Sequence, residues 1–161
     1  MEYITLKKGR EEIYKATYIA EYILSFYKEK YGCTISNLKL QKVLYFLQAN
    51  HLVTLEKALF SDQILAVDFG PYISEVWEKY CIYGGANIPV FKGKSTTSFR
   101  IKKEEREIIN EMLNVLNPYS SAELLNIIHQ QMPWYKAYHQ LNGFNRKKII
   151  CNDDLYEFFK D

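Results

Sequence analysis

Three polar side chains at helical spacing are the first residues of this chain that could do chemistry. Gln41, Tyr45 and Gln48 stand at positions i, i+4 and i+7, so on a helix they form one stripe. Two amides and a phenol can make several neutral hydrogen bonds, but they do not exchange a proton near pH 7, because an unperturbed tyrosine has a pKa of about 10. The stripe therefore indicates either the binding of a partner or the pairing of buried backbone groups inside the domain.

Histidine and cysteine are the other side chains that could act as bases or nucleophiles. The chain contains three of each: His51, His129, His139, Cys33, Cys81 and Cys151. A histidine beside a cysteine would supply a base and a nucleophile, but the sequence offers no third group to orient the base and no oxyanion donor. The cysteines are odd in number and include no Cys-x-x-Cys pair. We therefore predict no catalytic residue, no metal and no cofactor, and a hydrolase that uses these side chains is the enzymatic alternative.

The stripe must be positioned by the segment 35–52, which the sequence predicts as a central helix. Ser36 is the expected N-cap, and Ile35 with Leu40 has the spacing of a hydrophobic staple. One face of this helix is apolar, with Leu40, Val43, Leu44 and Leu47. Phe46 and Val53 carry apolar character to the far side, and a helix that is apolar on more than one face is usually buried.

The elements around this helix follow from periodicity and from turn residues. We predict a helix over about 10–31, a short strand at Ile64–Val67, and a helix whose first turn contains Pro71. The buried face of that helix is predicted to carry Ile73, Val76, Trp77 and Tyr80. Residues 84–98 form a loop, and Phe99 to Ile101 is a candidate second strand.

Further helices are predicted toward the end of the chain. One ends near Asn117-Pro118, and the next begins at Ser120, which has the capping-box spacing with Glu123. Pro133 is expected to end that helix, a short helix follows over about 134–141, and Asn152 is expected to cap the last. The predicted fold is mainly α: one compact domain over residues 1–161, with six or seven helices and a small two-stranded β element.

Charge and length narrow the class of protein. A net charge of +2 over 161 residues is too small for a typical nucleic-acid binder. The two small basic clusters, Lys7, Lys8 and Arg10 and then Arg146 to Lys148, are interpreted as solvated surface. No leader-like segment and no run of 18 apolar residues is present, so we expect a cytoplasmic protein that does not bind membranes.

Three segments, in this order, resemble the Panacea domain, the phage-associated family that includes the SocA-like and GepA-like proteins. They are the run Leu-Lys-Leu-Gln-Lys-Val-Leu-Tyr-Phe at 38–46 with Gln48, the turn Phe69-Gly70-Pro71 with the helix after it, and His129 with Pro133-Trp134. The resemblance covers about residues 10–159. Two positions depart from the family pattern: Tyr72 stands where a small branched residue is more common, and Gln131 stands where an acidic residue is common.

This resemblance implies a mainly helical antitoxin of prophages and mobile elements, which neutralises a protein toxin by direct binding and in some members delivers it to a protease. The expected partner-binding residues are Lys39, Gln41, Lys42, Tyr45, Gln48, Gly70, Pro71, Tyr72, His129 and Trp134. Of these, Tyr72 is expected to project outward, whereas Trp134 is favoured as a core residue over a surface anchor. The alternative function is a nucleic-acid-binding transcriptional regulator of a phage or mobile element, against which the charge argues.

Overall fold

The computed structural model describes residues 4–8, 11–91, 95–141 and 143–161, and in these residues it shows a mainly α domain with two small sheets. The side chains of Lys7 and Lys8, and the whole of Arg10, lie outside the described part. The α-helices are α1 (Ala16–Tyr31), α2 (Asn37–Leu55), α3 (Ser74–Tyr80), α4 (Lys103–Leu116), α5 (Ser121–His129), α6 (Met132–Tyr138) and α7 (Asn152–Phe159). The strands are β1 (Ile4–Lys8), β2 (Glu11–Tyr14), β3 (Ile64–Val67), β4 (Gly70–Tyr72) and β5 (Ile149–Ile150).

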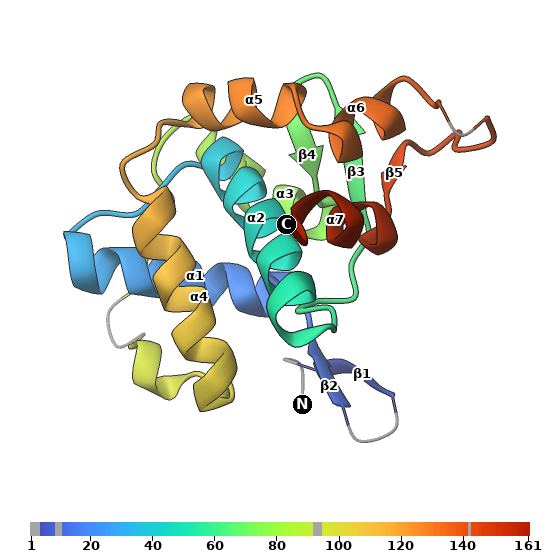
Figure 1. Ribbon diagram of the computed structural model, residues 1–161. Coiled ribbons are helices and arrows are strands. Elements are labelled where there is room, and N and C mark those ends of the chain that lie inside the picture. The colour runs from blue at the N-terminus through green and yellow to red at the C-terminus, as the bar shows by residue number, and fades with distance from the viewer. Residues whose placement is uncertain (1–3, 9–10, 92–94, 142) are drawn as a thin grey trace.

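Helix α2 runs through the centre of the domain, and the other elements surround it (Figure 1). Helices α1 and α4 lie on one side, the sheet of β3, β4 and β5 with α7 lies on the other, and α5 with α6 runs along the top. The β1–β2 hairpin projects from the lower end. No helix in the described ranges has the length and apolar character needed to cross a membrane.

Helix α2 starts where the sequence predicts. The Ser36 hydroxyl accepts a hydrogen bond from the Lys39 amide at 3.2 Å. The helix ends at Leu55, and its C-cap, Glu56, has a left-handed φ of 55°. The apolar face is buried at Leu40, Val43, Leu44 and Leu47. Because the opposite side also contacts neighbouring elements, α2 is buried over most of its circumference, as a helix with several apolar faces should be.

The three-stranded sheet differs from the predicted two-stranded element. Strand β3 lies between β4 and β5, both antiparallel to it, with Leu65 opposite Tyr72 on one side and Ile149 on the other. The prediction of a strand at Phe99–Ile101 was wrong. Phe99 and Ile101 are buried, but they lie in irregular backbone after the 3-10 helix η2 (Thr96–Ser98). Their hydrophobicity therefore reflects core packing and not strand pairing.

Several predicted boundaries also move. The first helix begins at Ala16 and not near residue 10, because residues 11–14 pair with 4–8. Pro71 belongs to the edge strand β4, where a missing amide is tolerated, and α3 starts only at Ser74. Pro133 lies in the first turn of α6. Asn152 is the first residue of α7 and not its N-cap, which is Cys151. The capping box of Ser120 and Glu123 is confirmed.

Candidate partner-binding site

The amide of Gln48 is buried and fastens the segment between α2 and β3. Its Oε1 accepts hydrogen bonds from the amides of Leu59 at 2.9 Å and Phe60 at 3.1 Å, and its Nε2 donates to the Phe60 carbonyl at 2.9 Å. A longer bond of 3.3 Å reaches the Asn152 side chain. Gln48 thus ties a loop and the start of α7 to the central helix.

Gln41, at the other end of the stripe, also fastens a neighbouring segment to α2 through its side-chain amide. Its Oε1 accepts from the Ile73 amide at 2.8 Å, and its Nε2 donates to Asn37 Oδ1 at 3.0 Å. Asn37 in turn donates to the Trp77 carbonyl at 3.1 Å. The two amides therefore hold the backbone of α3 and of the residue before it against α2.

Tyr45, between these two glutamines, is fully buried and donates a hydrogen bond of 2.8 Å to Gln131 Oε1, just before α6. Burial raises the pKa of its phenol, so the hydroxyl remains protonated. All three side chains of the stripe lie inside the domain and bond to it. Of the two alternatives that the sequence left open, the structure shows the pairing of internal groups.

The two lysines of the same segment lie beside the stripe. Lys39 is half-buried, donates to the Asn117 carbonyl at 3.1 Å and lies over the Tyr27 ring at 6.0 Å. Lys42 is 1% exposed, and its ammonium donates to the Leu38 carbonyl of its own helix at 3.0 Å. Burial lowers the pKa of Lys42 to about 8.

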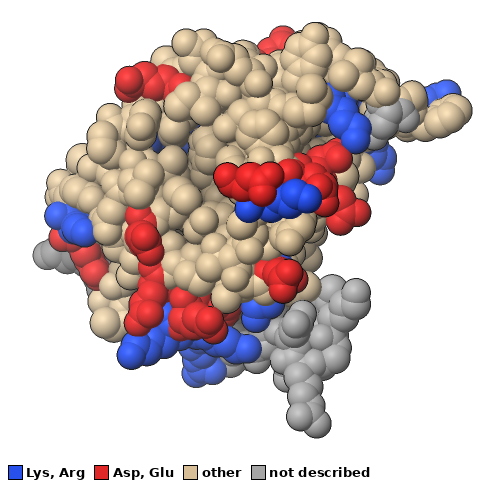
Figure 2. All heavy atoms as spheres, viewed as in Figure 1, with Lys and Arg blue, Asp and Glu red and all other residues tan. Residues whose placement is uncertain are grey.

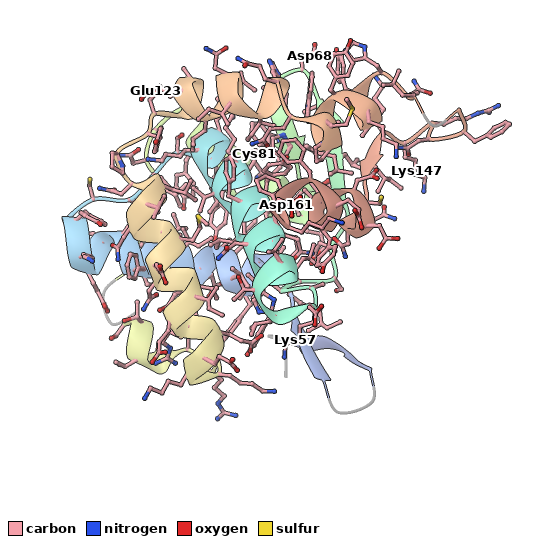
Figure 3. All side chains as sticks on the ribbon, in the orientation of Figure 1. Lys57, Asp68, Cys81, Glu123, Lys147 and Asp161 are labelled. Atoms are coloured by element: carbon pink, nitrogen blue, oxygen red, sulfur yellow. The ribbon has the colours of Figure 1, made fainter. Side chains whose placement is uncertain are left out.

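Two of the predicted residues, His129 and Trp134, lie side by side with ring centroids 4.2 Å apart and hold the β3–β4 turn. His129 Nε2 lies 2.9 Å from the Asp68 carbonyl oxygen, and Trp134 Nε1 donates to the Val67 carbonyl at 3.0 Å. Trp134 is buried and stacks on Tyr138 with a centroid distance of 4.5 Å. Tyr138 also donates to the Asp68 carboxylate, which Figure 3 labels at the top of the turn. Trp134 is therefore a core residue that supports this turn.

Gly70 allows the turn to pack closely. Its φ of 105° is unfavourable for other residues, and a Cβ at this position would lie 3.2 Å from Leu125 Cδ1 and 3.6 Å from Lys42 Cε. Pro71 is buried beside it, whereas Tyr72 is half-buried. The turn thus presents Tyr72 at the surface while its neighbours face inward.

Tyr72 belongs to a group of three half-buried aromatic residues, which we call the aromatic trio: Phe69, Tyr72 and Trp77. The ring centroids are 6.4 Å apart for Phe69 and Tyr72, 6.0 Å for Tyr72 and Trp77, and 5.4 Å for Phe69 and Trp77. Sequence reasoning placed Trp77 on the buried face of its helix and did not select Phe69. Aromatic residues on both sides of the Gly-Pro turn were the available signal.

A second buried polar cluster contains the one fully buried histidine among the described residues. His51 Nε2 lies 2.8 Å from Glu105 Oε2, and His51 Nδ1 lies 2.8 Å from the Lys57 carbonyl oxygen. Tyr14 donates to Glu105 Oε1 at 2.9 Å. Burial alone would raise the pKa of Glu105, but the bonds from His51 and Tyr14 and the nearby charges outweigh it and hold the pKa below its usual value. This cluster joins α2, α4 and the end of β2.

The remaining candidate reactive side chains, the three cysteines, do not form a cluster. Cys33, Cys81 and Cys151 are all exposed. Within the described ranges, no group of three or more histidine, cysteine, aspartate or glutamate side chains has the arrangement of a metal site. On the face that Figure 2 shows, acidic and basic side chains are interspersed, and much of the surface carries neither.

A family model described as "Antitoxin SocA-like, Panacea domain" matches residues 40–135, which run from the first turns of α2 into α6. The match therefore covers the stripe, the turn, the aromatic trio and Trp134. Searches of curated proteins and of solved structures found no match.

Proposed function

Because the chain belongs to the antitoxin SocA-like Panacea family, we propose that it acts as an antitoxin that neutralises a protein toxin by binding it directly, with the aromatic trio as the centre of the contact. The family supports an antitoxin-type role and a protein partner. The observation that carries the choice of surface is a cluster of three partly exposed aromatic rings at the β3–β4 turn and on α3, a region whose backbone is held by hydrogen bonds from Gln41, Asn37 and Trp134.

The chemistry of the trio suits a protein contact. Tyrosine and tryptophan are enriched among residues that dominate binding energy, because they bury large area and lose little conformational entropy. An interface of standard size buries about 800 Å² on each partner, so residues beyond the trio must contribute. The trio would be the central anchor of such a surface.

The backbone beneath the trio is fixed before any partner arrives. Gln41 holds the Ile73 amide, Asn37 holds the Trp77 carbonyl, and Trp134 holds the Val67 carbonyl. A surface that is ordered in the free protein loses less entropy on binding and therefore binds more tightly. In this proposal the stripe and Trp134 support recognition through the backbone and do not touch the toxin.

Delivery of the bound toxin to a protease is a further part of the proposal, and it rests on the family resemblance alone. If it occurs, the toxin should have a shorter half-life in cells that contain this protein. A toxin that is neutralised at constant abundance would limit the mechanism to binding.

The proposal is tested by co-expression with the candidate toxin, the product of a gene adjacent to this one that arrests growth by itself. We expect rescue of growth and co-purification with the wild type, and binding at least about 30-fold weaker with Tyr72→Ala or Trp77→Ala, as for typical anchor residues. Tyr119→Ala is the matched control, since Tyr119 is 40% exposed and lies outside the trio. Equal loss in the control, or full binding by both trio variants, would contradict the proposed surface.

A further inference from the structure

Residues 143–148, which we call the finger, project from the domain between α6 and β5 (Figure 1). Phe144 in the finger is 93% exposed. Among the large hydrophobic side chains that the structure describes, this is the highest exposure. Leu141, just before the finger, is 59% exposed. A phenyl ring this exposed gains nothing from the fold of its own domain, because almost none of its surface is removed from water.

The finger is held in one shape by its own hydrogen bonds. Asn145 donates from Nδ2 to the Ile149 carbonyl at 2.8 Å and accepts at Oδ1 from the Ile149 amide at 2.9 Å. The Arg146 amide donates to the Phe144 carbonyl at 2.9 Å, and the Lys148 amide donates to the Asn145 carbonyl at 3.0 Å. The exposed ring is therefore carried on a folded support.

The base of the finger is attached to the sheet and to α6. The Ala66 amide of β3 donates to the Lys148 carbonyl at 2.8 Å, and the Lys148 ammonium lies 4.3 Å from the Tyr138 ring centroid. Lys148 adopts a left-handed φ of 56°, which costs about 1 kcal/mol or more outside glycine and persists only when surrounding contacts hold it. These contacts fix the direction in which the finger leaves the domain.

Two exposed cations, Arg146 and Lys147, follow Phe144 in the finger. Arg146 and Lys147 are exposed, and in the described part of the chain neither has a carboxylate within 4 Å. Figure 3 labels Lys147 near the base of the finger, beside β5. The finger therefore combines one apolar ring with two uncompensated positive charges.

We propose that the finger is a second contact with the partner toxin: Phe144 inserts into an apolar pocket of the toxin, and Arg146 and Lys147 face acidic residues at the rim of that pocket. The inference rests on the proposed function and specifies the chemistry of the partner. Apolar contact supplies affinity, whereas complementary charge at a rim mainly raises the rate of association and selects the partner.

The base of the finger and the aromatic trio are attached to the same three-stranded sheet. Tyr72 lies on β4 and the finger leads into β5, so the two flank β3 on opposite sides. Neighbouring strands are about 4.8 Å apart, so β4 and the base of the finger at β5 are about 10 Å apart, a distance that one standard interface spans.

A protein pocket fits the finger better than a nucleic acid or a lipid surface. Non-specific single-strand binders use several stacking rings along a basic groove, whereas the finger offers one ring and three cations, of which Lys148 lies against the Tyr138 ring. Acidic side chains also lie beside basic ones on the face that Figure 2 shows. One such pair is Asp154 with Lys136 of α6, 3.1 Å apart. A polyanion would be repelled by such carboxylates.

The test introduces the photo-crosslinking residue p-benzoylphenylalanine at position 144 of the full chain, with the same residue at position 158 as the control. Phe158 is 42% exposed on α7. We expect position 144 to crosslink the toxin in cells, at a peptide that contains both apolar and acidic residues. Crosslinks from both positions alike, no crosslink to the toxin, or a crosslinked peptide without acidic residues would overturn the inference.

The affinity and the association rate for the purified toxin test the same inference quantitatively. Phe144→Ala should weaken binding about 30-fold, and the pair Arg146→Glu with Lys147→Glu should slow association at least 10-fold at low salt and remove its salt dependence. Phe158→Ala should bind as the wild type does. If Tyr72→Ala no longer binds the toxin but Phe144→Ala binds it fully, the proposed function is supported and the finger contact is refuted. If the wild type does not bind the toxin, both proposals are refuted.

Two further probes separate the other classes of partner. The wild type and the double charge reversal are measured against a fluorescent 20-nucleotide oligo(dT) and against vesicles of phosphatidylcholine with phosphatidylglycerol at 3:1. We expect binding too weak to detect at 150 mM salt. Micromolar binding of either probe that the charge reversal abolishes would overturn the assignment to a protein pocket.

Discussion

Replacement of Gln48 by methionine isolates what the stripe contributes to folding. Methionine has nearly the same length and shape, but it can no longer pair the amides of Leu59 and Phe60 or the Phe60 carbonyl. These three backbone groups are buried beneath α2, and each buried group that loses its partner costs about 1 to 3 kcal/mol. We therefore expect Gln48→Met to lower the free energy of unfolding by about 3 to 9 kcal/mol, out of the 5 to 15 kcal/mol that is typical of a domain.

Urea unfolding followed by far-ultraviolet circular dichroism measures this loss. For a slope of about 2 kcal/mol per molar, the midpoint should fall by about 1.5 to 4.5 M while the slope stays constant. Tyr45→Phe is the internal comparison, because it removes a single bond to Gln131 and should cost only about 1 kcal/mol. A loss below about 1 kcal/mol for Gln48→Met, equal to that of Tyr45→Phe, would refute the anchoring role of the stripe.

Three further predictions concern buried charge and close packing. Because the pKa of Glu105 is held below its ordinary value of 4.5, its stabilising contribution is complete above that pH and is lost as the pH falls through the lower, folded value; acid titration should destabilise the wild type more than Glu105→Gln. The pKa of Lys42 is about 8 in the folded protein and has its ordinary value of 10.5 in the unfolded chain. Between pH 8 and 10.5 the unfolded chain therefore binds more protons, so the free energy of unfolding should rise with pH in this interval. Lys42→Met should lose that rise and gain about 3 kcal/mol at pH 7, as unfolding at both pH values will show. Gly70→Ala should cost about 1 to 3 kcal/mol in thermal or urea unfolding, whereas Gly85→Ala, where an added Cβ meets no atom within 4 Å, should be close to neutral.

The features that could be predicted from the sequence are those determined by neighbouring residues. The cap at Ser36 and the capping box at Ser120 depend on an amide three positions away, so a sequence window of four residues contains the whole interaction. The apolar face of α2 is likewise a matter of 3.6-residue spacing. The family resemblance added what no local pattern carries, namely the antitoxin-type role.

The features that could not be predicted depend on pairs far apart in the chain. Strand β5 pairs with β3 across more than 80 residues, and Tyr45 finds Gln131 86 positions away. The sequence showed that Phe99 and Ile101 belong in the core, but hydrophobicity does not distinguish a buried loop from a strand. Trp77 has the spacing of its helix's buried face, yet it lies beside the turn, where the other two rings of the trio surround it.

The support of the trio acts on backbone atoms and leaves its side chains free to vary. Four of the bonds that hold this region end on the Ile73 amide and on the carbonyls of Val67, Asp68 and Trp77, and a fifth joins Tyr138 to the Asp68 carboxylate. None of them depends on which side chain stands at position 72. A change of ring at the surface should therefore alter partner choice at little cost to folding. This arrangement suits a protein whose partner must be recognised specifically.

Replacement of Tyr72 by valine tests this separation directly, because valine removes the ring and keeps a β-branched side chain that suits a strand. Tyr72 is half-buried on an edge strand, where valine is well tolerated, so the free energy of unfolding should change by less than about 1 kcal/mol. Toxin binding should weaken at least 10-fold, because the contacts of Tyr72 with both other rings disappear. Calorimetric titration of the toxin and urea unfolding of the same preparation give both numbers. A large loss of stability with unchanged affinity would show that the trio is part of the core and that recognition lies on another face.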